Sequence, residues 1–211
     1  MKRGFLISFE GGDGCGKSTQ IKRFCKKLEE KGIEYVLSVE PGGTKLAKMA
    51  NDILKSNKQD LSVVVELLLF SAARADHVDK IIRPALKQGK VVVLDRYYDS
   101  TYAYQGGGGK MPFELISQVT ELAVCECKPD LTFVLDISYE EAFNRKSKDA
   151  KLKHLDRFEN KGKAYHDNVR QAYLDIAKIF KDRIVVVDAD RDAQTIEKEI
   201  WTEFEKRKLN K

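Results

Sequence analysis

The chain has 211 residues, of which 42% are hydrophobic and 34% charged, and it carries a net charge of +5 at pH 7. This length suits one α/β domain with a sizeable core, and the longest apolar runs are too short to span a bilayer, which argues against a membrane protein. The moderate positive charge suits an anionic substrate, and the lack of a separate basic tail or stripe argues against a nucleic-acid partner.

The N-terminal residues lead directly into a predicted strand at residues 4–9, so we expect no signal segment and a cytoplasmic protein. A glycine-rich loop and a helix over residues 18–31 follow, and the loop matches G-x-x-x-x-G-K-[ST]. Such a loop turns backbone N–H groups toward phosphate oxygens, its lysine reaches the β- and γ-phosphates, and its hydroxyl ligates Mg²⁺. The predicted ATP contacts are Gly11, Gly12, Asp13, Gly14, Cys15, Gly16, Lys17, Ser18 and Thr19.

A second strand is predicted over residues 35–39, and it ends at the loop formed by residues 40–44. Loops at the carboxyl ends of strands are where α/β folds bind ligands. After the helix that follows, residues 57–60 match N-K-x-D, the guanine-reading motif of GTPases. That motif should follow an apolar strand, and here it follows an amphipathic helix, so the GTPase interpretation stays a minor alternative.

Residues 63–88 form the longest predicted helical stretch, which Pro84 could kink or break. Residues 63–70 are apolar on nearly all sides, which predicts burial all round, either inside the domain or against another subunit. Phe70 and Arg74 share one face of this helix. An aromatic ring beside a fork of donors suits a base that is stacked and read at its edge.

A buried strand over residues 91–94 ends at Asp95 and Arg96. An acid at this place is typical of the second half of a P-loop enzyme, with its carboxylate near Mg²⁺ and a bound water. Arg96 would project into the same crevice and hold a second phosphate. A short helix over residues 100–105 is expected, and residues 106–109, all glycine, are predicted to form a flexible turn.

The remaining chain alternates helices with strands at residues 131–135 and 184–187. This pattern predicts an α/β fold with a five-stranded parallel sheet and helices on both faces. Residues 146–163 are dense in charge. They form either a solvated loop or a short lid that closes over phosphates with Arg145 and Arg157, which bracket it.

These motifs together resemble the thymidylate kinase family, in the bacterial-type branch of the P-loop nucleoside monophosphate kinases. The resemblance runs from Phe5 to about Asp188 and rests on residues 9–20, 40–44, 69–74, 95–97, 100–106 and 156–159. It implies one kinase domain over residues 1–211, with the lid at about 146–163, working as a homodimer. It also implies Mg²⁺-dependent transfer of the γ-phosphoryl group from ATP to dTMP, which gives ADP and dTDP.

The resemblance also implies roles for single residues. Phe70 stacks on thymine, Arg74 reads its edge, and Tyr104 lies by the sugar, while Arg96 holds the dTMP phosphate. The implied dTMP contacts are Asp13, Glu40, Pro41, Phe70, Arg74, Arg96, Thr101, Tyr104 and Gln105. The implied metal contacts are Ser18 and, through a Mg²⁺-bound water, Asp95.

One branch of the family carries an arginine inside the phosphate-binding loop, which supplies positive charge to the transferring group. Gly14 stands at that place here. In the bacterial-type branch the lid supplies the charge, so we expect Arg157, with Arg145, to act as a catalytic clamp beside Lys17 and Arg96.

Three alternatives stay open at this point. A related kinase could use another acceptor, such as dUMP or a deoxynucleoside. A GTPase-type switch would use residues 57–60, and a nucleic-acid-binding module would rest on the lysines of residues 146–163.

Overall fold

The computed structural model describes residues 3–56, 60–147 and 157–209. Its five strands are all parallel and form one sheet in the order β2-β3-β1-β4-β5, which confirms the predicted α/β fold. The strands are β1 (Phe5–Glu10), β2 (Tyr35–Val39), β3 (Val91–Asp95), β4 (Leu131–Asp136) and β5 (Ile184–Asp188).

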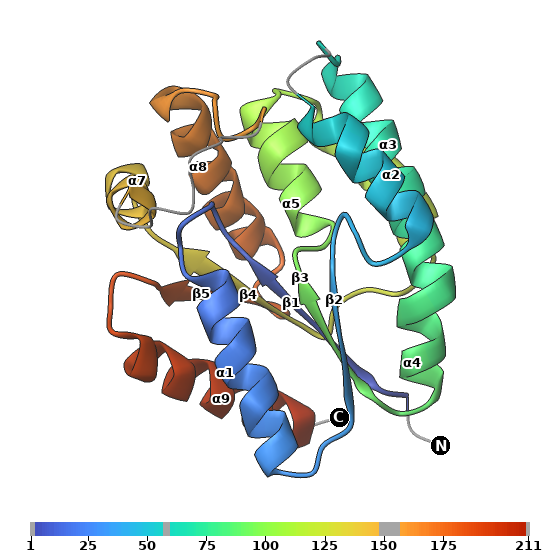
Figure 1. Cartoon of the computed structure of the whole chain (residues 1–211), viewed down its shortest axis with the longest axis vertical. Coiled ribbons are helices and arrows are strands. Elements are labelled where there is room, and N and C mark those ends of the chain that lie inside the picture. The colour runs from blue at the N-terminus through green and yellow to red at the C-terminus, as the bar shows by residue number, and fades with distance from the viewer. Residues whose placement is uncertain (1–2, 57–59, 148–156, 210–211) are drawn as a thin grey trace.

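Helices cover both faces of the sheet, as Figure 1 shows. The helix α1 (Lys17–Glu30) and the C-terminal α9 (Ala193–Leu209) pack on one face, where Phe5, Ile7 and Phe9 join their core. Leu6 points to the opposite core. The helices that contribute to that core are α3 (Val63–His77), α4 (Arg83–Lys87), α6 (Phe113–Val124) and α8 (Lys163–Ile179). The short α5 (Asp99–Thr101) lies between Tyr98 and Tyr102, which also belong to this core. Because both faces are buried, the strands are apolar along most of their length.

The strands present polar residues where they end. In the parallel register Phe9 and Val39 both lie opposite Asp95, so the ends of β1, β2 and β3 meet at one edge. The strand order reverses next to β1, and such a switch point opens a crevice at the carboxyl edge of the sheet. The loop after β1 begins at this edge, and residues of the loop, of α2 (Lys45–Lys55) and of α7 (Tyr139–Ser147) line one cavity there.

The long helical stretch over residues 63–88 is interrupted. Between α3 and α4 the chain makes a π-helical turn, η1 (Val78–Ile82), and Pro84 sits in the first turn of α4. Since proline lacks a backbone N–H, the wider turn before it accommodates the missing hydrogen bond.

The prediction that residues 63–70 are buried all round is wrong within one chain. Val64 and Leu68 are 52% and 56% exposed, while Glu66 and Leu67 are buried. The exposed side of α3 is therefore consistent with the other predicted alternative, a contact with another subunit.

The prediction of a flexible turn at residues 106–109 is also wrong. Gly106, Gly107 and Gly108 belong to a π-helical turn, η2 (Tyr102–Gly108), that packs against α8. A Cβ atom on Gly107 would lie 2.5 Å from the Ala172 Cβ. Glycine is required here because no side chain fits between the two elements.

Some predicted features fall outside the described residues. They are Asn57, Lys58 and Gln59 of the N-K-x-D match and residues 148–156 of the predicted lid. Across the ranges that the structure does describe, no helix is both long and apolar enough to cross a membrane.

Candidate active site

A cavity of about 700 Å³ opens at the carboxyl edge of the sheet. It brings together most of the residues predicted from the sequence. These are Asp13, Gly14, Cys15, Gly16, Lys17, Ser18, Thr19, Glu40, Pro41, Phe70, Arg74, Asp95, Arg96, Thr101, Tyr104, Gln105 and Arg145. Gly11 and Gly12 line a smaller hollow on the other side of the loop. Arg157 does not line the cavity.

The phosphate-binding loop holds its own lysine. Lys17 Nζ donates to the carbonyl oxygens of Gly11 and Gly12, both at 2.9 Å, and lies 3.7 Å from Cys15 Sγ. The helix α1 begins after Gly16, and no side chain caps its first turn. The free N–H groups of that turn and the helix dipole suit an anion.

Gly14 lies directly beneath α7. Its φ is +85°, and a Cβ atom built on it would lie 2.6 Å from the Ala142 carbonyl oxygen and 3.0 Å from Lys146 Cγ. Backbone of α7 therefore occupies the space that any side chain at this position would need. The loop cannot carry an arginine here without displacing α7.

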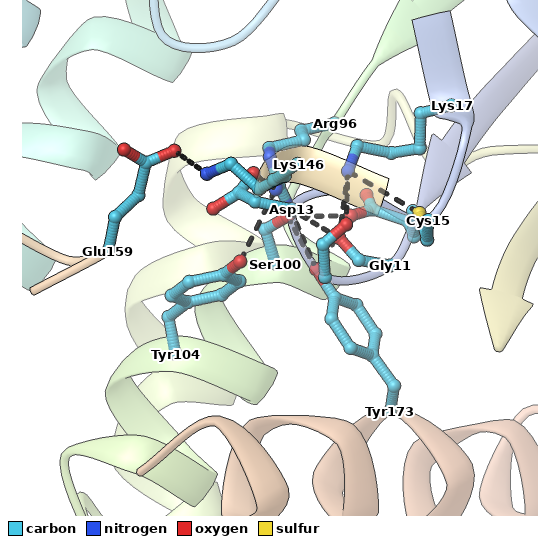
Figure 2. A network of polar contacts seen from close by, with 12 residues as sticks. Gly11, Asp13, Cys15, Lys17, Arg96, Ser100, Tyr104, Lys146, Glu159 and Tyr173 are labelled. Atoms are coloured by element: carbon cyan, nitrogen blue, oxygen red, sulfur yellow. Dashed lines mark hydrogen bonds and ion pairs between the residues drawn. The ribbon is translucent and has the colours of Figure 1, made fainter. Parts of the chain in front are cut away.

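Arg96 has a left-handed backbone, with φ of 67°. Its guanidinium donates to the Gly11 carbonyl oxygen at 2.8 Å and to Asp13 Oδ1 at 2.6 Å (Figure 2). The hydroxyl of Tyr104 lies 3.3 Å away. Burial alone would raise the pKa of Asp13, but the positive charges of Arg96, Lys17 and Lys146 outweigh it and lower that pKa below its usual value.

The buried carboxyl group of Glu10 fixes the peptide next to Arg96. It accepts the Tyr97 N–H at 2.7 Å and the Ser100 hydroxyl at 2.6 Å. Burial raises the pKa of Glu10 to about 8, and the nearby Asp99 carboxylate reinforces the shift. Sequence reasoning missed Glu10, although an acid ending an apolar strand just before the loop is a usable signal.

Arg74 is held from two sides at the other end of the cavity. Its Nε donates to Glu40 Oε2 at 2.8 Å and its Nη2 donates to Thr101 Oγ1 at 3.0 Å. His77, also buried, contacts the second Glu40 oxygen through Nδ1 at 2.9 Å. The remaining nitrogen, Arg74 Nη1, is buried and has no hydrogen-bond partner among the described residues. An unpaired buried donor costs about 1–3 kcal/mol, so a ligand acceptor here would recover that cost.

Glu66 connects Gln105 with Arg157. Gln105 Nε2 donates to Glu66 Oε2 at 2.8 Å, and Arg157 Nη2 lies 2.8 Å from Glu66 Oε1. Arg157 Nε also donates to the Leu54 carbonyl oxygen at 3.2 Å. The guanidinium of Arg157 is thus directed toward α2 and α3.

Arg145 is anchored near the end of β5. It donates to the Ala189 carbonyl oxygen at 2.8 Å and to Asp190 at 3.1 Å. Arg191 follows in the same loop and also lines the cavity. Lining residues that were not predicted as site residues are Gln20, Val39, Asn51, Leu54, Lys55, Tyr97, Ser100, Lys146, Phe158, Arg191, Ala193 and Ile196. Arg191 could have been predicted as a site residue, since it follows the carboxyl end of a predicted strand.

The two side chains predicted to serve a metal, the Ser18 hydroxyl and the Asp95 carboxyl group, both line the cavity. Hard oxygen ligands are those that Mg²⁺ prefers. Over residues 3–56, 60–147 and 157–209, no group of three His, Cys, Asp or Glu side chains could hold a metal ion. The donor set therefore fits an ion that takes its other ligands from phosphates and water.

Comparison with known proteins gives consistent matches over nearly the whole chain. The thymidylate kinase family model matches residues 9–200. The chain is 44% identical over 196 residues to a thymidylate kinase of Symbiobacterium thermophilum, covering 92% of this chain and 90% of the relative. It is 43% identical over 197 residues to one of Caulobacter vibrioides, covering 93% of each. A crystal structure of thymidylate kinase from Ehrlichia chaffeensis matches with a TM-score of 0.75 and 34% identity, covering 96% of this chain and 99% of that one.

Proposed function

Since the chain belongs to the thymidylate kinase family and is a kinase that phosphorylates dTMP with ATP, we propose that the cavity holds both substrates. The ATP phosphates lie on the loop over residues 11–19, and dTMP lies between Arg96 and Arg74. The observation that carries this proposal is a shared carbonyl. Lys17 Nζ and Arg96 Nη1 donate to the same oxygen, that of Gly11, at 2.9 and 2.8 Å. Two cations that meet at one atom can hold two phosphates side by side, as direct transfer requires.

Lys17 acts on the donor nucleotide. Its ammonium exchanges the carbonyl oxygens of Gly11 and Gly12 for phosphate oxygens of ATP, while the first turn of α1 supplies N–H donors. Ser18 and Asp95 would hold Mg²⁺, with Asp95 acting through a bound water. The ion would supply positive charge that offsets the charge of the phosphates.

Arg96 and Asp13 act on the acceptor nucleotide. Arg96 exchanges part of its contact with Asp13 for the dTMP phosphate, which leaves the Asp13 carboxylate available to the sugar. Tyr104, whose ring lies 5.2 Å from the Arg96 guanidinium carbon, borders the sugar. The buried tyrosine would leave no space for a 2′-hydroxyl, which favours a deoxyribose.

The thymine base lies against Phe70, with Arg74, Thr101 and Gln105 at its edge. The unpaired Arg74 Nη1 supports this proposal, because a base carbonyl would satisfy it. Gln105 gives its amide N–H to Glu66, which leaves its amide oxygen as an acceptor for a base N–H. Glu40 and Pro41 border the same end of the cavity.

Arg157 can act as the catalytic clamp only if its side chain moves. Because its guanidinium pairs with Glu66 outside the cavity, a clamp over the phosphates requires that this ion pair open. Arg157→Ala separates two roles. A clamp predicts a large loss of kcat with little change in the KM for dTMP, whereas an anchor for the Gln105 side of the pocket predicts a raised KM with kcat retained.

We also propose that residues 1–211 form one kinase domain with a lid at about 146–163. Support comes from two described residues of this segment, Lys146 and Phe158, which line the cavity. Arg145 would steady the start of the lid through its contacts near the end of β5.

We further propose a homodimer that uses the exposed side of α2, α3 and α6. The helix α3 packs against both of the others, and each exposes large apolar side chains, among them Met49, Leu68 and Leu122. Contiguous exposed apolar surface is typical of an interface. Leu68→Glu should convert the dimer to a monomer in sedimentation, and a monomeric wild type would contradict the proposal.

We also propose a cytoplasmic location. All four cysteines are unpaired, which suits a reducing compartment. Cell fractionation with a tagged chain tests this.

The experiment that tests the function is a steady-state assay of ADP formation from ATP and Mg²⁺ with dTMP, dUMP, dCMP and dAMP. We expect the highest kcat/KM with dTMP. A preference for dUMP would leave the phosphate chemistry intact and overturn the base assignment.

A further inference from the structure

In the transition state the transferring phosphoryl group carries negative charge. A cation in addition to those that bind the two substrates is needed to stabilise this charge. The space over Gly14 is filled by α7, so the loop cannot provide one. Arg157 is paired with Glu66, and Arg145 is bonded to Ala189 and Asp190. In the described part of the chain, both arginines predicted for this task are therefore already bonded to other protein groups.

Lys146 is the cation that does lie over the loop. Its Cγ is 3.0 Å from where a Gly14 Cβ would be, so its side chain runs across the position of the missing arginine. It lines the cavity, and Figure 2 shows it beside Asp13. Its charge, with those of Lys17 and Arg96, acts on the Asp13 carboxylate, so cations from α1, from α7 and from the residue after β3 converge on one side chain.

We propose that Lys146 is a further catalytic residue, whose ammonium group contacts the transferring phosphoryl group in place of the arginine that Gly14 excludes. The inference rests on the proposed arrangement of ATP and dTMP in the cavity.

In the transfer step, a dTMP phosphate oxygen forms a bond to the γ-phosphorus while the bond to the β,γ-bridging oxygen breaks. The electron pair of that bond leaves with ADP, and no proton needs to move. Charge spreads over the three equatorial oxygens during the step. Lys146 donates N–H bonds to one of them, a contact that is strongest in the transition state.

Glu159 gives Lys146 a second position. The two side chains form an ion pair, and both are largely buried. This pair keeps the charged ammonium group at the edge of the cavity, and the positive charge of Lys146 is balanced by the Glu159 carboxylate until substrate binds. Phosphate oxygens would then replace the Glu159 carboxylate, so Glu159 is a positioning residue.

Lys146→Met tests the proposal in the full-length enzyme. We expect kcat to fall about 100-fold or more with KM values for ATP and dTMP within about threefold of wild type, and Lys146→Arg to recover most of the loss. Lys178→Met, which removes an exposed lysine from α8, is the matched control and should keep wild-type rates.

A binding measurement gives a second readout. The complex of ADP, dTMP and aluminium fluoride mimics the transferring group, and Lys146→Met should weaken its assembly by about the same factor as kcat while ADP alone binds normally. Glu159→Gln breaks the ion pair but keeps the cation, so it should lose less than about tenfold in kcat.

Two results would overturn the inference while leaving the proposed function standing. One is a Lys146→Met enzyme with kcat near wild type. The other is equal loss in Lys146→Met and Glu159→Gln, which would assign the effect to the ion pair rather than the ammonium group. Failure of the proposed function would look different, because the wild type itself would not phosphorylate dTMP.

Discussion

At the base end of the cavity the Arg74 guanidinium is 2% exposed and is fixed by Glu40 and Thr101, whereas at the phosphate end Lys17 and Arg96 are bonded to the very loop that binds phosphate. The first set of contacts can persist when substrate binds. The second set occupies groups that the substrate needs, so it must be exchanged.

The difference reflects what each end has to do. A buried guanidinium that is fixed through Nε and Nη2, and whose Nη1 has no protein partner, selects a ligand by shape and hydrogen bonding. Cations held by carbonyl oxygens and by Asp13 stay paired without substrate, and phosphate offers them a stronger partner. The base end is therefore built in advance, and the phosphate end is built to change partners.

The largest loss of activity should come from substituting Arg96, because its guanidinium is bonded to the loop without substrate and is proposed to bind the dTMP phosphate with it. Arg96→Ala removes the proposed dTMP phosphate contact and leaves Asp13 without its closest cation. We expect kcat/KM for dTMP to fall by about 1,000-fold or more. Steady-state kinetics measure this, with Arg23→Ala as control, since Arg23 pairs with Glu197 and neither residue lines the cavity. A loss under tenfold would contradict a phosphate role for Arg96.

A smaller, different loss is expected at the base end. Arg74→Lys keeps the charge but cannot reproduce the fork that joins Glu40, Thr101 and a base carbonyl. We expect the KM for dTMP to rise about 10–100-fold while kcat changes little. If kcat falls instead and KM stays constant, Arg74 acts on the reacting group and the contrast between the two ends is wrong.

Sequence reasoning reached the residues that stand in motifs. The loop over residues 11–19 is recognisable because strand, glycines and helix follow one another, and Asp95 with Arg96 because an apolar strand ends there. Phe70 and Arg74 could be paired since they are one helical turn apart. All of these are local patterns, and the fold class follows from the alternation of strands and helices.

The partners of those residues could not be found in the same way. Glu66 and His77 look like ordinary members of a helix, and their roles depend on Gln105, Arg157 and Glu40, which lie far away in the chain. Whether the exposed apolar face of α3 is covered depends on partners outside its own helix, which a local pattern does not reveal. A run of glycines is equally compatible with a flexible loop and with two elements packed closely together. The sequence alone therefore did not predict η2.

The base end depends on that tight packing, because Tyr104 and Gln105 belong to η2. Gly107→Ala would push a methyl group against α8, and we expect a loss of about 2 kcal/mol in the free energy of unfolding, with a raised KM for dTMP. Gly162→Ala, where nothing lies within 4 Å, should cost less than about 1 kcal/mol. Urea unfolding compares the two. Equal small losses would mean that η2 and α8 are not closely packed.

The phosphate end should also respond to pH through Glu10, whose pKa burial raises from an ordinary value of 4.5 to about 8. Below about pH 4.5 both the folded and the unfolded chain carry the proton. Between there and pH 8 the unfolded chain releases it while the folded chain keeps it, so Glu10 makes the protein less stable as pH rises, by at most about 1.4 kcal/mol per pH unit.

Glu10→Gln cannot titrate, and its amide can still accept the Tyr97 N–H while facing the Ser100 hydroxyl. The free energy of unfolding of the wild type minus that of the variant, measured in urea from pH 5 to 9, should therefore fall up to about pH 8 and then level off. A difference that stays flat over this range would mean that Glu10 is already ionised in the folded protein, and that the carboxylate beneath Arg96 belongs to the same set of paired charges as Asp13.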